Sequence, residues 1–412
     1  MASRRPAPAR TGGNLLLLTQ HAQPRPAVAA RRLRQLSEWG LKHFTRVFAI
    51  RGDRESYVGA ELPGVITFPI PLRDLRSSLP QSGPAIAVPP SGLLASLLPF
   101  RQAFPFLYLT DDGGFPYRRS AFAQACKLVD AEGITNILSS FRPWSDHLVA
   151  RKLKRKYPHL HWIADFRDLH ADPVRRDVWW PALQQRWARR VLRTADEVWG
   201  VSEGQVRHLR DLYPAAAVHR SRLDRLPPPV TAPRTDRFTL VYTGSLYADL
   251  QSCDPLRRAL ADLLQRRQID PDDIELIYRG KDRRVWEAWA EAFPPGIHLN
   301  SGDRIAPASA QQLQYAAQVL LLLSWSAEDY HGVLTAKLYD YLAAGRPILA
   351  LVNGPDDPEL RGIIEGALSG KVFANGENVS EWLLMLYRKW KAGSRTLPWE
   401  SDRDVLQQYL VR

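Results

Sequence analysis

Lys337 and Asp340 lie three residues apart in a segment whose pattern predicts a helix from about 334 to Gly345. Residues at this spacing share one face of a helix. A lysine in the first turn also lies next to free N–H groups and the positive end of the helix dipole. We therefore expect an anion such as a diphosphate to bind at Lys337, while Asp340 accepts hydrogen bonds from two adjacent hydroxyls. The alternative is an ordinary amphipathic helix with an ion pair between the two side chains.

Charged side chains also follow a predicted strand in the first half of the chain. The strand 161–165 ends on Asp165, and Arg167, Asp168 and His170 come directly after it. Two carboxylates that flank a guanidinium can orient each other and a ligand, and a histidine can act as a general acid or base. The alternative is a structural ion-pair network at a strand end, with His170 as a plain loop residue.

The turn after the predicted strand 14–19 is basic. It leads through TQHAQPRPAVAARRLR into a predicted helix and brings His21, Arg25 and Arg32 to the end of the strand. These side chains can point toward a bound ligand, although a solvated basic loop is the alternative. The turn contains no GxGxxG pattern, which argues against dinucleotide binding of the dehydrogenase type.

A second turn, Gly244 and Ser245, follows the predicted strand 238–243. Its backbone N–H groups can cradle a phosphate. Arg279 and Lys281 come after the next strand and can add positive charge. The alternative is a plain strand-end turn with two solvated cations.

Strands that alternate with helices must position all of these groups, and the sequence contains two such series. Alternation of this kind predicts parallel, doubly wound sheets, in which ligands bind outside the carboxyl ends of the strands. Three consecutive prolines at 227–229 stop both helix and central strand and therefore separate the two series. The expected organisation is a basic disordered tail (1–13), an N-terminal Rossmann-like domain (14–224), a Pro-rich linker (225–236), a C-terminal Rossmann-like domain (237–394) and a segment (395–412) that packs back on the N-terminal domain.

The composition narrows the class of protein. With 412 residues, 45% of them hydrophobic and only two cysteines, the chain is globular and carries neither a disulfide scaffold nor a cysteine-built metal cluster. We find no secretory signal and no apolar run long enough for a membrane helix, so a cytoplasmic protein is expected. The net charge of +13 suits a phosphorylated ligand, an anionic membrane or nucleic acid, but also a bias toward arginine in the composition. No aromatic-basic motif supports nucleic-acid binding.

The predicted helix 180–193 adds a second expectation about partners. Trp180, Leu183, Trp187 and Val191 fall on one face, and its arginines lie largely off that face. A helix of this kind rests on anionic lipid, which predicts peripheral contact with a membrane. The alternative is a core helix with a basic outer face.

The segment 330–351, YHGVLTAKLYDYLAAGRPILAL, resembles the donor-site motif of family 4-like glycosyltransferases of the GT-B fold. The family pattern K-[LF]-x-E-Y-[LI]-A-x-G-[RK]-P-[IV]-L is matched by Lys337, Asp340, Tyr341, Gly345, Arg346 and Pro347. Asp340 stands where the family has Glu, and Gly332 stands where it has an earlier acidic residue. The segments DFRD (165–168) and TGSLY (243–247) also resemble the family, and Arg31 or Arg32 matches an arginine at the start of its first helix.

This resemblance implies two Rossmann-like domains that face a cleft, and transfer of a sugar from a nucleotide-sugar donor with retention and without a metal or other cofactor. The acceptor is a glycan, a lipid-linked molecule or a small molecule. In the implied site, Lys337 neutralises the leaving diphosphate with Arg279 or Lys281, Asp340 holds the ribose, and Asp168 or His170 touches acceptor or donor. The other expected contacts are Gly244, Ser245, Gly332 and Val333 on the donor side and His21, Arg25, Arg32, Asp165 and Arg167 on the acceptor side. A nonhydrolysing sugar-nucleotide epimerase and a catalytically silent binding protein are the alternatives.

Overall fold

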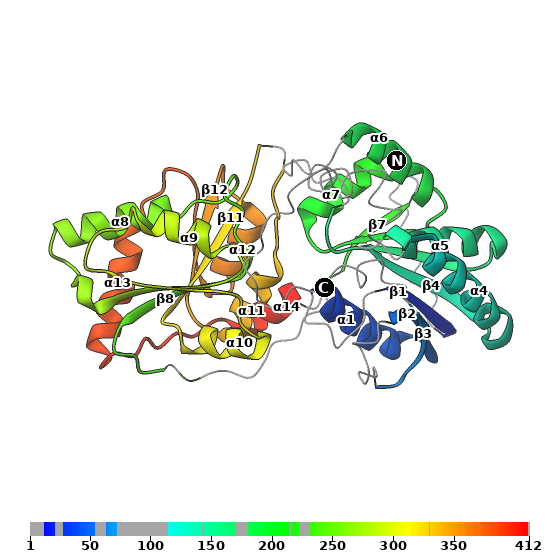
Figure 1. Ribbon diagram of the computed structural model, residues 1–412, viewed down its shortest axis with the longest axis horizontal. Helices are drawn as coiled ribbons and strands as arrows, with labels where there is room; N and C mark the ends of the chain where they lie inside the picture. The colour runs from blue at the N-terminus through cyan, green and yellow to red at the C-terminus, as the bar shows by residue number, and fades with distance from the viewer. Residues whose placement is uncertain are drawn as a thin grey trace, which may run out of the picture. The chain divides into compact units, whose positions relative to one another are not determined.

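The computed structural model describes residues 12–20, 28–53, 63–71, 114–141, 144–169, 180–214, 216–221, 231, 233–328 and 330–410. His21, Arg25 and His170 lie outside these ranges, as do most of the predicted tail and linker. The chain divides into two compact units, Met1–Leu223 and Asp224–Arg412. Each unit is described by itself (Figure 1).

The first unit contains a seven-stranded sheet in the order β3-β2-β1-β4-β5-β6-β7, with every neighbouring pair parallel. Its strands are β1 (Asn14–Thr19), β2 (Arg46–Asp53), β3 (Val65–Pro71), β4 (Ile134–Phe141), β5 (His161–Phe166), β6 (Glu197–Gly200) and β7 (Ala217–Arg220). The described helices are α1 (Val28–His43), α4 (Gly114–Glu132), α5 (Trp144–Lys156), α6 (Pro181–Leu192) and α7 (Glu203–Leu212).

The central strand β1 shows why an apolar run becomes a strand here. All four leucines from Leu15 to Leu18 are buried, because helices cover both faces of a parallel sheet. Leu16 pairs with Phe48 of β2 on one side and with Ile137 of β4 on the other. The chain order therefore reverses between β1 and β4, and this reversal is the place where such sheets bind ligands.

The second unit repeats the plan with six parallel strands in the order β10-β9-β8-β11-β12-β13. The strands are β8 (Phe238–Thr243), β9 (Ile274–Arg279), β10 (His298–Gly302), β11 (Val319–Trp325), β12 (Ile348–Asn353) and β13 (Gly370–Phe373). The helices are α8 (Asp254–Gln265), α9 (Arg283–Ala290), α10 (Pro307–Ala316), α11 (Ala336–Ala344), α12 (Pro358–Gly366), α13 (Ser380–Ala392) and α14 (Arg403–Leu410), with the 3₁₀ turn η2 (Pro271–Asp273) before β9.

The second sheet separates two cores, because successive side chains of a strand point to opposite faces. Leu240 and Tyr242 of β8 join one core with α8, α9 and α13, whereas Val241 joins the other with α11, α12 and α14 (Figure 1). Both sheets and the alternation of strands and helices confirm the predicted α/β class with two doubly wound, Rossmann-like units.

Helix α11 differs from the sequence-based expectation at its start and agrees with it at its end. Helix α11 begins at Ala336 rather than at 334, because Gly332 has a φ of +76° and Thr335 is still extended as the N-cap. Lys337 is therefore the second residue of the helix. The helix ends on Gly345 with a φ of +63°, the left-handed conformation that glycine adopts at helix ends, as predicted.

The last segment of the chain packs within the second unit. Leu406 of α14 lies in the core beside α12, and the Asp402 backbone N–H donates to the carbonyl of Ala367. Its expected contact with the N-terminal domain stays a prediction. None of the helices in the described ranges combines the length and apolarity needed to cross a bilayer.

Candidate functional site

The carboxyl edge of the second sheet gathers the residues that the sequence predicts for the donor side. The turn at Gly244 and Ser245 follows β8, and the loop that contains Gly332 and Val333 follows β11. Strands β8 and β11 are neighbours at the point where the strand order reverses. Helix α11 starts there and brings Lys337 under the turn, since a side chain added at Gly244 would lie 3.2 Å from Lys337 Cδ.

Lys337 contacts the turn and a buried tyrosine rather than Asp340. Its Nζ donates to the Ser245 carbonyl oxygen at 2.9 Å and to Tyr242 Oη, and it lies 4.1 Å from the centre of the Tyr242 ring. Burial lowers the pKa of Lys337 to about 7, although the Asp282 carboxylate acts in the opposite direction. The ion pair between Lys337 and Asp340 that we considered as an alternative is therefore wrong.

A small set of rings and carboxylates fixes this turn. Tyr242, Tyr278 and Trp286 form a stack, with the rings of Tyr278 and Trp286 5.2 Å apart. Tyr278 Oη donates to the Gly244 carbonyl, and an added Cβ at Gly280 would lie only 2.0 Å from that same oxygen. Glycine is therefore required at 280 for the close approach of two strand ends.

Asp282 positions the turn and was not recognised in the sequence. Its Oδ2 accepts the backbone N–H of Leu246 at 2.9 Å, and its own backbone N–H donates to Tyr278 Oη at 3.0 Å. The signal available in the sequence was only an acid three residues after Arg279. An acid in a loop after one strand does not reveal that it caps the loop after the neighbouring strand.

Asp357 positions the loop after β11, as Asp282 positions the turn after β8. The carboxylate is fully buried, accepts the backbone N–H of Gly332 at 2.8 Å and also caps α12 by accepting the N–H of Leu360 at 3.1 Å. Asp357 was also missed, although an Asp directly before a Pro-led helix is an N-cap signal. Gly332, which stands where the resembling family has an acid, is thus held by a carboxylate from another loop.

Asp340 lies one turn after Lys337 and is half-buried. It is next to Tyr341, whose pKa is raised to about 12 by burial, with a smaller contribution from the charge of Asp340. Tyr341 Oη accepts the backbone N–H of Thr243 at 3.0 Å, which joins α11 to the end of β8. Helix α11 is therefore held against the end of β8 by Lys337 and Tyr341.

Arg279 and Lys281 are placed differently from each other. The Arg279 guanidinium donates to the carbonyl of Asn300 at 2.9 Å and to its side-chain oxygen at 2.8 Å, so it ties β9 to β10. Lys281 is exposed. In this structure the Arg279 side chain serves strand pairing, and Lys281 is the more accessible of the two cations.

In the first unit, Arg32 and Asp165 form a buried ion pair. Arg32 Nη2 lies 2.5 Å from Asp165 Oδ1 and its Nε donates to Asp165 Oδ2 at 3.2 Å, while Ser221 and Ser140 complete the contacts. Both charged side chains are nearly inaccessible. We expected Asp165 to flank Arg167 together with Asp168, and this is wrong for Asp165, which is paired with Arg32.

Arg167 instead pairs with its neighbour. Its Nε lies 3.2 Å from Asp168 Oδ2, and the Asp168 side chain is 58% exposed. The Arg167 carbonyl accepts from Gln205 Nε2 at 3.2 Å. Among the candidate acceptor residues with described side chains, Asp168 is therefore the one that presents a carboxylate to solvent at the carboxyl edge of β5.

Two further buried polar residues of this unit were not weighed in the sequence. Asp146 accepts the backbone N–H of Gln20 at 2.9 Å and the hydroxyl of Tyr117 at 2.8 Å, so it fixes the chain where it leaves β1. His147 is fully buried against Ser139, with its Nδ1 2.7 Å from the hydroxyl oxygen, and burial lowers its pKa to about 3. His147 is therefore a neutral core residue.

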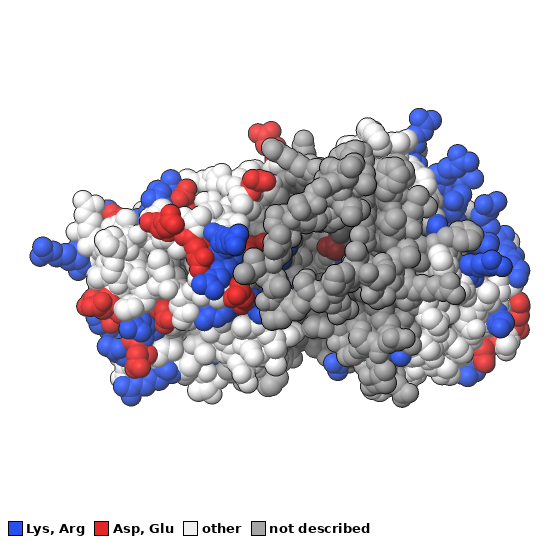
Figure 2. All heavy atoms as spheres, viewed as in Figure 1, with Lys and Arg blue, Asp and Glu red and all other residues white. Residues whose placement is uncertain are grey.

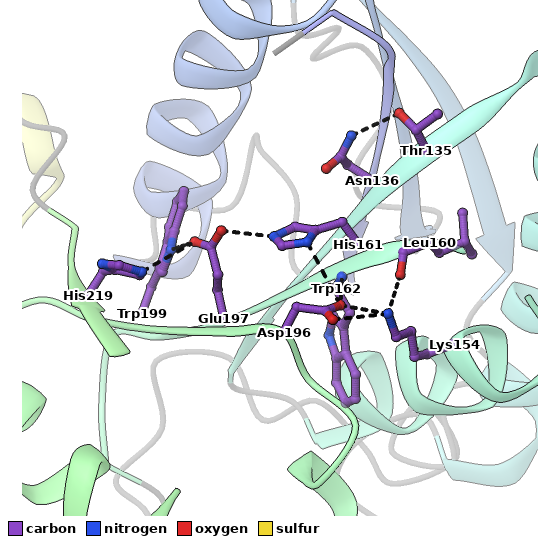
Figure 3. A network of polar contacts seen from close by, with 10 residues as sticks. All are labelled: Thr135, Asn136, Lys154, Leu160, His161, Trp162, Asp196, Glu197, Trp199 and His219. Atoms are coloured by element: carbon purple, nitrogen blue, oxygen red, sulfur yellow. Dashed lines mark hydrogen bonds and ion pairs between the residues drawn. The ribbon is translucent and has the colours of Figure 1, made fainter. Parts of the chain in front are cut away.

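The polar network in Figure 3 lies at the opposite, amino edge of the first sheet. His161 Nε2 is 2.8 Å from Glu197 Oε1, and Lys154 Nζ donates to Asp196 at 2.8 Å. Burial acts to raise the pKa of Glu197, but hydrogen bonds from His161 and Trp199 outweigh it and leave the pKa below its usual value. Within the described part of the chain, neither this network nor any other cluster of His, Cys, Asp and Glu could hold a metal ion.

No protein-family model and no curated protein matches the chain. Solved structures, in contrast, match the chain. The sucrose-phosphate synthase of Thermosynechococcus elongatus is 14% identical, with 97% of this chain and 95% of that chain covered and a TM-score of 0.58. The N-terminal domain of trehalose-6-phosphate phosphatase from Candida albicans is 10% identical, with 96% and 91% covered and a TM-score of 0.51. Both likenesses extend over nearly the whole chain, and they show its fold.

Proposed function

We propose that this chain, which has the GT-B fold of two Rossmann-like units, transfers a sugar from a nucleotide-sugar donor to an acceptor. The observation that carries the proposal is Lys337, an ammonium group held beneath the Gly244–Ser245 turn at the reversal of strand order. A half-buried cation in the first turn of a helix is suited to stabilise a leaving diphosphate, because the N–H groups at that helix end add to its positive charge. In this proposal the positive charge comes from the protein, and no metal ion is required.

The remaining donor contacts are assigned around this cation. The backbone of Gly332 and Val333 borders the donor, Asp340 binds the ribose hydroxyls, and Lys281 supplies a second cation. Arg279 would have to leave Asn300 to take that place, so Lys281 is the better candidate. The acceptor is assigned to the first unit, where Asp168 is the exposed carboxylate. Retention of configuration is part of the proposal because of the family resemblance.

A nucleotide panel followed by a donor hydrolysis assay tests this function. Nucleoside diphosphates and their sugar conjugates should raise the melting temperature, and one conjugate should be hydrolysed slowly in the absence of acceptor. Lys337→Ala should lose the nucleotide-induced shift and at least about 100-fold in hydrolysis, as expected for removal of one group that stabilises a developing charge.

Lys371→Ala is the matched control, because Lys371 is an exposed lysine of the same unit on β13. This variant should behave like the wild type. If Lys337→Ala retains the wild-type rate while it folds cooperatively, the assigned role of Lys337 is wrong.

A nucleotide-binding protein without transferase activity is the second candidate. Two observations favour it: Gly332 stands where the resembling family has an acid, and the guanidinium of Arg279 is engaged by Asn300. Binding of a nucleotide sugar without hydrolysis, together with no transfer to any of a set of glycan and lipid-linked acceptors, would support this candidate against the transferase.

A further inference from the structure

Helices α5 and α6 of the first unit pack together and share an exposed surface. Trp144 of α5 and Trp187 of α6 meet edge to face with ring centres 4.9 Å apart. Val191 is buried. The sequence predicts one apolar face of Trp180, Leu183, Trp187 and Val191, but in the structure Trp187 and Val191 point inward. Trp180 and Leu183 stay outside, with 58% and 52% of their surface exposed.

A row of arginines continues from this exposed pair along α6. Arg186, Arg190 and Arg193 follow Leu183 at intervals of three, four and three residues, a spacing that keeps side chains on one side of a helix. All three are exposed. The two apolar side chains therefore lie at the N-terminal end of a basic row.

The arginines of α5 join the same row. The pKa of Arg151 is lowered first by burial and then by the like charges of Arg155, Arg190 and Arg193, which shows that cations from both helices converge. Figure 2 shows Lys and Arg side chains gathered at the end of the first unit where Figure 1 places α5 and α6.

No exposed acid on either helix balances this charge. Helix α6 contains no Asp or Glu, and the only one in α5 is Asp146. Asp146 is buried and accepts hydrogen bonds from Tyr117 and Gln20, so it faces away from the solvent. The basic side chains are therefore available to an anionic partner. We use the term α5–α6 basic surface for Arg151, Arg155, Arg186, Arg190 and Arg193 together with Trp180 and Leu183.

We propose that the α5–α6 basic surface binds an anionic lipid bilayer, with Trp180 and Leu183 entering the headgroup region and the arginines contacting lipid phosphates. A tryptophan and a leucine beside a row of cations combine the two attractions that hold an interfacial helix. Arginine side chains also have apolar stems that lie along such an interface while the charge remains in water. The proposal does not depend on the proposed transferase activity.

Vesicle flotation with the full-length protein tests the proposal. At low salt we expect binding to phosphatidylcholine vesicles that contain about one third phosphatidylserine, and much weaker binding to pure phosphatidylcholine, because the latter has no net negative charge to attract the arginines. Added salt should weaken the binding, because surface charges are screened within about 10 Å at 0.1 M salt. The variant Arg186→Gln/Arg190→Gln/Arg193→Gln should lose about 100-fold in affinity, since each basic residue near an anionic leaflet contributes about fivefold.

A matched control removes the same charge elsewhere. Arg258→Gln/Arg284→Gln/Arg388→Gln changes three exposed arginines of the second unit and should bind vesicles as the wild type does. The variant Trp180→Ser/Leu183→Ser keeps every charge and should weaken the binding that persists at high salt. Thermal melts of all variants establish that they are folded.

Three results would overturn the proposal: no flotation with anionic vesicles at low salt, equal flotation of the wild type and both surface variants, or loss of binding in the control triple variant. A short duplex RNA serves as the competing polyanion. If RNA binds more tightly than the vesicles do and Trp180→Ser/Leu183→Ser has no effect on either ligand, the surface is a nucleic-acid site instead.

Discussion

The surroundings of Lys337 disfavour the protonated, positively charged form of its side chain. Its Nζ has the Tyr242 hydroxyl, the Tyr242 ring face and the Ser245 carbonyl as neighbours, and burial lowers its pKa to about 7. A bound diphosphate would favour the charged form of the lysine and raise that pKa. The protonation state of this one residue should therefore be linked to nucleotide binding.

Nucleoside diphosphate affinity should accordingly fall as the pH rises above 7, because a growing fraction of the free protein then carries a neutral Lys337 that must take up a proton to bind. The dissociation constant should increase by up to about tenfold per pH unit. Isothermal titration at pH 8 in buffers of different ionisation enthalpy should detect proton uptake. Lys337→Met should bind weakly and with less pH dependence, and an absence of proton uptake by the wild type would contradict the linkage.

At the scale of elements, Arg32 and Asp165 join α1 to β5, and Ser221 extends the contact to the end of β7. The pair is almost completely buried, so removal of one partner leaves an uncompensated charge in the interior. We expect Arg32→Met and Asp165→Asn each to lower the free energy of unfolding by about 3–5 kcal/mol, and the double variant to lose clearly less than the sum.

Urea unfolding of the two single variants and the double variant measures this coupling. The exposed pair Arg46–Glu132 provides the comparison, since its side chains are 47% and 32% exposed. Glu132→Gln should cost no more than about 1 kcal/mol. Additive effects of Arg32→Met and Asp165→Asn would show that the buried contact is not the source of the stability.

Asp357 connects the loop after β11 to α12. Asp357→Ala should lower the free energy of unfolding by about 2–4 kcal/mol, because it removes a helix N-cap and leaves the buried Gly332 N–H without its acceptor. It should also weaken nucleotide binding by loosening that loop. Asp356→Ala, which removes an exposed ion pair with Arg361, should change neither quantity appreciably in thermal melts and nucleotide titrations.

At the scale of the whole molecule, the chain consists of two compact units with separate hydrophobic cores. A ligand that binds only the folded second unit stabilises that unit by mass action, by about 2.7 kcal/mol at a hundredfold excess over its dissociation constant. Hydrogen exchange should therefore slow by up to about 100-fold in peptides that cover β8 and β11 when a nucleoside diphosphate is added. Peptides that cover β5 and β6 should not change, and equal protection of both units would argue against a donor site confined to the second.

The sequence by itself determined the class of fold and many of its elements. The leucine run of β1 and the glycine at the end of α11 were both predicted, because an apolar run and the end of a helix are recorded in residues close together in the chain. The strand β7 was not predicted, since its four residues, AVHR, include a single buried side chain and form no apolar run. Helix α11 was predicted two residues too early, because Gly332 and Thr335 delay its start.

Tertiary structure alone decided which charges meet. Arg32 and Asp165 are 133 residues apart, and Lys337 and the Ser245 carbonyl are 92 apart. These separations result from crossover connections that place distant strand ends side by side, and no spacing in the sequence encodes them. The same holds for Asp282 and Asp357, whose carboxylates fix loops that follow other strands. The sequence thus located Lys337, and the fold decided that it faces a turn and a tyrosine instead of Asp340.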